Sequence, residues 1–148
     1  GPRTVLAVGR GAGWTARSVS VRRYVWHFTT ANAARGIRGD CDFLASASGT
    51  DGPGVYFTDL APGHDRARLS RALWNAWRAA RMQAHIRVPF DPADMLQSER
   101  HEHVFFVPGG GYSLHGMDDL AIGFWTGADP SDPADMGSWR EEPFSCLQ

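Results

Sequence analysis

The sequence contains no lysine, because all 15 of its basic residues are arginine. This absence excludes chemistry that needs a lysine amine, including Walker A phosphate loops, protein kinases and Schiff-base or pyridoxal-phosphate enzymes. No apolar run approaches the roughly 20 residues of a membrane-spanning helix. The 148 residues, 43% of them hydrophobic, are enough for one domain with a buried core and exclude disorder by composition.

Acidic and basic residues are unevenly divided along the chain. Residues 1–90 carry a formal charge of +8 and residues 91–148 a charge of −9, which together give the net charge of −1. A uniformly basic face is therefore not predicted. The two cysteines, Cys41 and Cys146, follow no metal or redox spacing. We expect two free thiols, with a single disulfide as the alternative.

The start of the sequence bears on its origin. Gly1-Pro2 is typical of the remnant of a cleaved tag, which favours a domain cut from a longer polypeptide. No charged segment followed by an apolar one opens the chain, so no secretory signal is visible. We expect a protein that has no membrane segment and acts in the cytoplasm of a host or target cell.

The spacing of apolar residues predicts a compact α+β domain in which several strands surround one long helix. Residues 1–19 are expected to form an irregular lead-in with one short strand at 4–8, and residues 128–148 a poorly ordered tail rich in Pro and Asp. Thr30 is predicted to cap a short helix that ends near 37, and a long helix is predicted over 65–83. Further strands are predicted at 21–29, 43–47, 54–59, 84–90, 103–107 and 120–125.

Three weaker motifs have ordinary explanations. Thr4–Gly13 imitates a dinucleotide-binding loop, but Trp14 stands where that fingerprint has its third glycine. His101–His103 and His115 offer a metal site, yet a solvated strand start is favoured because no further ligand completes a known spacing. The arginines of 65–83 suit a phosphate or nucleic acid, although a solvent-facing helix surface is the favoured explanation.

Three features together carry the candidate chemistry. His27 lies in a predicted strand, Tyr56 lies in the predicted strand 54–59, and the acidic pair Asp118-Asp119 opens the last apolar strand. Each has an ordinary explanation by itself, as a core histidine, a sheet aromatic and an acidic turn. Their combination favours a binding or catalytic site over three separate structural roles.

In these segments the sequence resembles the ADP-ribosyltransferase toxins that carry a His-Tyr-Asp signature, in the diphtheria-toxin and poly(ADP-ribose)-polymerase-like branch of that superfamily. The resemblance implies a split antiparallel β-sheet with a few helices, and a catalytic domain at 20–127. Apart from the acidic pair, the similar segments are Tyr24–Thr30, Gly52–Gly63, Ala67–Trp74 and Val104–Pro108.

The resemblance also implies an enzyme that uses NAD+ as a substrate and needs no metal. Cleavage of the bond between nicotinamide and ribose develops positive charge at the ribose carbon, while the nicotinamide leaves as a neutral ring. The site therefore needs a carboxylate to stabilise the transition state more than it needs a general acid. By resemblance this carboxylate belongs to Asp119, with Asp118 as the alternative.

Other residues receive binding roles from the same resemblance. His27 would hydrogen-bond the adenosine ribose, the Phe28 backbone would hold the nicotinamide amide, and the Thr29 hydroxyl would support that pocket. Tyr56 would line the nicotinamide site, with Trp74 as a second stacking aromatic. Arginine suits the pyrophosphate, and the candidates are Arg35, Arg38 and Arg66.

One departure leaves the acceptor open. Many related transferases carry Glu or Gln two residues before the catalytic acid, where this chain has Met117 (before Asp119) or Gly116 (before Asp118). The acceptor is therefore a protein, a nucleic acid or water, and water would make the chain an NAD+ glycohydrolase. A non-catalytic nucleotide-binding module is the further alternative. A toxin of this kind also suggests an immunity protein as a partner.

Overall fold

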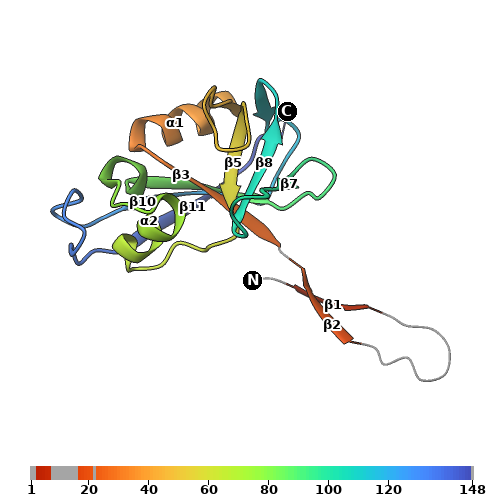
Figure 1. The fold of residues 1–148 in the computed structure, drawn as a ribbon. Coiled ribbons are helices and arrows are strands. Elements are labelled where there is room, and N and C mark those ends of the chain that lie inside the picture. The colour runs from red at the N-terminus through yellow and green to blue at the C-terminus, as the bar shows by residue number, and fades with distance from the viewer. Residues whose placement is uncertain (1–2, 8–16, 22, 148) are drawn as a thin grey trace.

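The computed structural model describes residues 3–7, 17–21 and 23–147. The main feature is an antiparallel sheet of seven strands in the order β11-β10-β6-β3-β5-β8-β7 (Figure 1). The mixed α+β class predicted from the sequence is confirmed. From one edge to the other the strands are Trp139–Phe144, Leu120–Trp125, Ala84–Pro89, Tyr24–Thr29, Gly54–Thr58, Val104–Pro108 and Leu96–Gln97.

Two short helices lie on opposite faces of this sheet. Helix α1, Ala31–Asp40, packs on the face that buries Val25, Ile86 and Ile122. Helix α2, Arg66–Trp74, packs on the other face around Phe28 and Met82 and is followed by a 3-10 turn η1, Ala79–Met82. Alternate side chains of β3 therefore pack on opposite faces of the sheet, one covered by α1 and the other by α2.

Smaller elements complete the fold. Strands β4, Asp42–Leu44, and β9, Gly111–Ser113, pair beside the main sheet. Strands β1, Arg3–Ala7, and β2, Arg17–Val21, form a separate antiparallel pair. The short strand predicted at 4–8 corresponds to β1, whereas the irregular lead-in predicted for 17–19 is wrong, because these residues belong to β2. The dinucleotide-like stretch Thr4–Gly13 lies largely outside the described residues. Among the described residues, no helix is long and apolar enough to cross a membrane.

The predicted long helix over 65–83 is wrong beyond residue 74. Asn75 adopts a left-handed conformation with φ of 57°, and its N–H closes the last turn on the Arg71 carbonyl. The Ser70 hydroxyl then donates to the Ala76 carbonyl at 2.6 Å and accepts the Arg78 N–H at 2.8 Å. These hydrogen bonds satisfy backbone groups that would otherwise bond within a longer helix, so the helix ends here.

The expectation of two free thiols is also wrong, because Cys41 and Cys146 form a disulfide across 105 positions of sequence. Cys41 ends α1 in a left-handed conformation, and the chain returns to it after β11. The Cys146 N–H donates to the Met117 carbonyl, and its own carbonyl accepts the Gly116 N–H, both at 2.8 Å. Sequence spacing could not show this approach, since it depends on how β10 and β11 pair.

The segment after Gly127, predicted to be poorly ordered, is part of the fold. Trp139–Phe144 pair with β10 as strand β11. The preceding loop is held by three side chains that need hydrogen-bond acceptors: Arg66 donates to the Pro130 carbonyl at 3.0 Å, Trp77 to the Ser131 carbonyl at 3.0 Å, and Trp125 to the Asp135 carboxylate at 2.6 Å.

Candidate functional site

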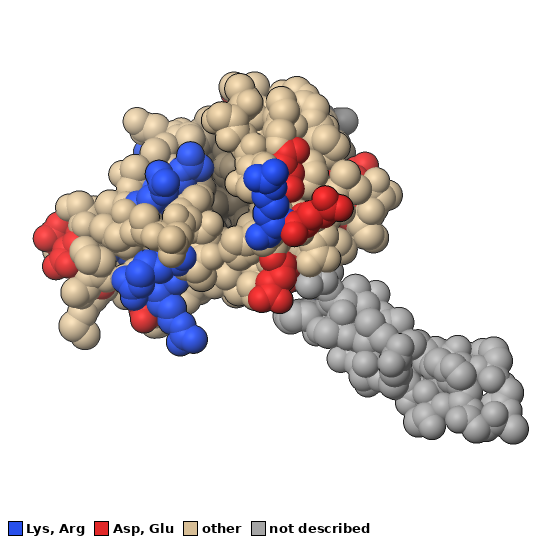
Figure 2. Space-filling view, viewed as in Figure 1, with Lys and Arg blue, Asp and Glu red and all other residues tan. Residues whose placement is uncertain are grey.

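A cleft opens where strands β3 and β5 separate. The two strands share a single register pair, Trp26 with Thr58. Beyond it, the His27 side chain bridges the gap by bonding the Tyr56 carbonyl at 2.7 Å. The cleft has a volume of about 420 Å³, and in the view of Figure 2 this face of the molecule is hollowed between its α2 and β5 sides. It is lined by residues 26–28, 44–46, 48–50, 54–58, 73, 74, 78, 81 and 104.

His27 presents a neutral ring to this cleft. Burial lowers its pKa, the Tyr56 carbonyl opposes that shift, and the positive charge of Arg81 lowers the pKa further. A carbonyl oxygen only accepts, so Nδ1 carries the proton and Nε2 is left as an acceptor. No described residue bonds Nε2. A ligand hydroxyl is the matching donor.

Phe28 and Thr29 follow on the same strand but differ in their relation to the cleft. Phe28 lines it, although its side chain is buried against His85 and Trp139 on the α2 face. Thr29 is half-buried and is not among the residues that line the cleft. The next residue, Thr30, caps α1 by accepting the Ala33 N–H at 3.1 Å, as the sequence predicts.

Tyr56 lines the cleft from β5, but its ring and hydroxyl already have partners. Its ring stacks on Phe106 with centroids 5.4 Å apart, and the ring also lies against Gly49. Its hydroxyl donates to the Gly52 carbonyl at 2.6 Å and accepts the Asp51 N–H at 2.8 Å. Tyr56 therefore holds the turn that forms one lip of the cleft.

The opposite wall carries the positive charge. Trp74 ends α2 there, and the Arg81 guanidinium lies 5.7 Å from the centre of its ring. Arg78 and Arg81 are the charged residues that line the cleft. The sequence suggested the arginines of 65–83 as phosphate ligands but favoured a solvent-facing helix, because the predicted helix continued through Arg78 and Arg81.

The arginines proposed from the sequence lie elsewhere. Arg66 is 1% exposed and donates to the Met82 carbonyl at 2.8 Å, so it supports the core on the α2 face. Arg35 and Arg38 project from α1 and line a different cavity.

Asp119 does not line the cleft. It precedes β10 and lies beside the start of β3, where its carboxylate accepts from the Tyr24 hydroxyl at 2.7 Å and from Arg87 at 3.1 Å. Arg23 lies 3.8 Å from the same carboxylate, whose side chain is 45% exposed. Asp119 also has a φ of 58°, which is uncommon for a residue other than glycine. Neighbouring Asp118 is exposed and is absent from the lining too.

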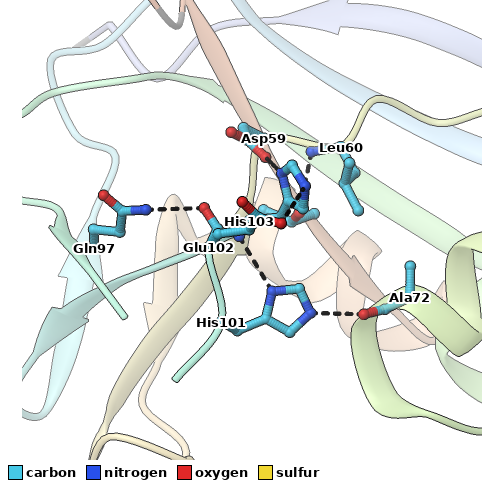
Figure 3. A network of polar contacts seen from close by, with 8 residues as sticks. Asp59, Leu60, Ala72, Gln97, His101, Glu102 and His103 are labelled. Atoms are coloured by element: carbon cyan, nitrogen blue, oxygen red, sulfur yellow. Dashed lines mark hydrogen bonds and ion pairs between the residues drawn. The ribbon is translucent and has the colours of Figure 1, made fainter. Parts of the chain in front are cut away.

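The cleft itself is lined by no Asp or Glu among the described residues. Asp59 is close in sequence to Thr58 but bonds His103 Nδ1 at 2.9 Å (Figure 3). His101 donates from Nε2 to the Ala72 carbonyl of α2 at 2.6 Å and accepts the His103 N–H. This network ties the segment before β8 to helix α2.

The histidines proposed as metal ligands have separate partners, since His115 faces Asp42 at 3.8 Å. Across residues 23–147, no group of three or more His, Cys, Asp or Glu is placed to hold a metal ion.

Comparison of the chain with protein-family models, curated proteins and solved structures finds no match.

Proposed function

We propose that the chain is an NAD+-dependent mono-ADP-ribosyltransferase of the bacterial toxin or effector type. One observation carries this proposal: between the separating strands β3 and β5, a neutral histidine offers a free acceptor nitrogen opposite two arginines. NAD+ combines hydroxyl donors on its riboses with a negative pyrophosphate. The cleft therefore matches both kinds of group, and its volume of about 420 Å³ lies in the usual range for ligand pockets.

Different residues of the cleft bind different parts of NAD+. His27 Nε2 accepts from a ribose hydroxyl, while Arg78 and Arg81 offer guanidinium donors to the pyrophosphate. Trp74 provides an aromatic wall for a planar ring. Tyr56 acts by holding the lip in place, because its hydroxyl is already bonded to the backbone of the turn.

The reaction also needs a carboxylate close to the developing positive charge at the ribose carbon. Asp119 is our candidate by resemblance, and it lies outside the cleft, beside the start of β3. Tyr24, Arg87 and Arg23 hold its carboxylate in one position, and its side chain remains 45% exposed. A carboxylate has about four lone-pair sites, so it can still accept from a ligand hydroxyl.

A second candidate is a nucleotide-binding module without catalysis. One observation favours it, namely that no carboxylate lines the cleft among the described residues. Such a module would bind NAD+ through the same histidine and arginines and would release no nicotinamide.

The test is incubation of the purified protein with NAD+ labelled on its adenylate half, with and without cell lysate. A transferase releases nicotinamide and attaches the label to a macromolecule, whereas a glycohydrolase releases free ADP-ribose. Bound but intact NAD+ would support the binding module. Protease and nuclease treatment of the labelled fraction then identifies the acceptor class.

A matched pair of variants links the result to the cleft. Arg81→Gln removes a lining charge, and Arg71→Gln removes an exposed charge of α2 that does not line the cleft. We expect NAD+ binding to weaken about tenfold in the first variant and to be unchanged in the second. Equal binding by both would contradict the assignment of the cleft.

A further inference from the structure

A second cavity lies on the α1 side of the sheet, between α1 and the edge strand β11. Its volume is about 460 Å³. It is lined by Ala31, Arg35, Arg38, Gln83, Phe124, Trp125, Pro130, Arg140 and Glu142. Three of these are arginines from two elements that are far apart in sequence, so the charge is gathered by the fold. We call it the α1–β11 groove.

The charges of the groove are only partly compensated. Arg38 lies 3.9 Å from Glu142, the one acid among the described residues that line the groove. Arg35 bonds the Asn32 side chain at 3.2 Å, a neutral partner that leaves its charge in place. Arg140 is exposed, and no described residue forms an ion pair with it. The groove thus keeps a positive charge in a protein whose net charge is −1.

Flat surfaces lie beside these charges. The Arg35 guanidinium lies 5.0 Å from the centre of the Phe124 ring. Arg140 is directly opposite Phe124 in the register of β10 and β11, which puts both on the same face of the sheet. The Gln83 carbonyl oxygen accepts the Ala31 N–H at 2.9 Å, and its amide nitrogen has no partner among the described residues.

We propose that the α1–β11 groove binds single-stranded nucleic acid. Arg35, Arg38 and Arg140 offer guanidinium donors to successive phosphates. The Arg35 guanidinium and the Phe124 ring offer planes on which an unpaired base stacks, and the Gln83 amide offers a donor to a base edge. An acidic peptide would use the charges but would leave the planar surfaces and the amide without a function.

The groove and the cleft both have lining residues near the end of β3. Ala31 of the groove follows Phe28 of the cleft by three residues, and Gln83 of the groove follows Arg81 of the cleft by two. A strand held in the groove is therefore placed beside the cleft. The inference that this strand is the ADP-ribose acceptor rests on the proposed function, whereas binding of the strand does not.

The test measures binding without NAD+. Fluorescence anisotropy of a labelled dT oligonucleotide of about 12 nucleotides gives the affinity of the full chain. We expect Arg140→Gln and Arg35→Gln each to weaken binding about fivefold, and each to make the slope of log affinity against log salt less negative by about 0.7. Arg68→Gln and Arg71→Gln, on exposed positions of α2, serve as controls and should bind like the unmodified chain.

Three results would overturn the proposal. The first is no binding at about 50 mM salt, where phosphate contacts are strongest. The second is equal weakening by the α2 controls, which would show a diffuse charge effect. The third is a poly-aspartate peptide that binds as tightly as the oligonucleotide and with the same dependence on Arg140, which would show a site for acidic protein. Nicotinamide release from NAD+ alone should be unchanged in Arg140→Gln, so a failure of this proposal is distinguishable from a failure of the proposed function.

Discussion

The polar side chains at the two ends of strand β3 differ in how many hydrogen-bond partners the protein itself provides. At its start, the Asp119 carboxylate accepts from Tyr24 and Arg87, with Arg23 close by. At its end, His27 has one partner in the Tyr56 carbonyl and keeps Nε2 unpartnered. A residue type alone therefore does not identify a binding group.

The difference arises from the sheet. Strand β6 pairs with β3 on one side and with β10 on the other. Near the start of β3, charged side chains therefore reach one another across these neighbouring strands. At the end of β3, the strand has separated from β5, and the missing neighbour leaves both a cleft and an unpartnered nitrogen.

The largest expected effect is a loss of folding stability at low pH, which arises near the end of β3 that carries His27. His85 lies behind Phe28, is 0% exposed, and burial lowers its pKa to about 4 from 6.5. Below pH 6.5 the unfolded chain binds a proton that the folded chain does not bind, so stability falls as the pH falls towards 4. The free energy of unfolding falls by about 3 kcal/mol, and the lowered pKa of His27 changes it in the same direction.

Urea unfolding at a series of pH values measures this dependence. His85→Leu keeps a buried apolar side chain and removes the titrating group, so its stability should depend less on pH below 6.5. An unchanged pH dependence in that variant would contradict the assignment to His85.

The second prediction concerns the carboxylate at the start of β3. Asp119→Asn removes the charge, and asparagine tolerates the left-handed conformation at this position. If Asp119 stabilises the transition state, the rate of nicotinamide release falls about 100-fold while NAD+ binding changes little. Asp118→Asn, at the adjacent exposed residue, tests the alternative carboxylate and should keep full turnover. Full turnover in Asp119→Asn would remove Asp119 from catalysis.

The third prediction concerns the unpartnered nitrogen of His27. His27→Phe keeps an aromatic ring and removes the acceptor, so NAD+ binding should weaken about tenfold. Isothermal titration measures the affinity, and His115→Phe, at an exposed position, is the control. Equal affinity of the two variants would show that the ribose is not bound at Nε2.

The smallest expected effect is at the lip of the cleft. Tyr56→Phe removes the hydroxyl that bonds Gly52 and Asp51 but keeps the stacked ring. Because the hydroxyl holds the lip, KM for NAD+ should rise about threefold with kcat nearly unchanged. Steady-state kinetics measure both constants. A lower kcat at constant KM would instead indicate a direct role for the hydroxyl in the reaction.

Local patterns predicted much of the central sheet. The strands around His27 and Tyr56 and the Thr30 cap follow from β-branched and aromatic spacing and from a capping residue that acts within its own turn. These features depend on neighbours in sequence. The structure brings His27, Tyr56 and Trp74 to one cleft and leaves Asp119 outside it.

Other features do not follow from the spacing of apolar and β-branched residues. The end of α2 is set by Asn75 and by the Ser70 hydroxyl, which override an apolar spacing that continues to residue 80. Arg78 and Arg81 reach the cleft only because the helix ends there. The position of Asp119 depends on Tyr24 and Arg87, whose proximity is a property of the paired strands.

The Cys41–Cys146 disulfide has a consequence for the connectivity of the chain. It closes a covalent ring that contains strands β4 to β11 and helix α2, while β3 and α1 lie outside the ring. A protease that cuts one bond within 42–145 therefore opens the ring without releasing a fragment. Both pieces stay attached on a non-reducing gel and separate only after reduction.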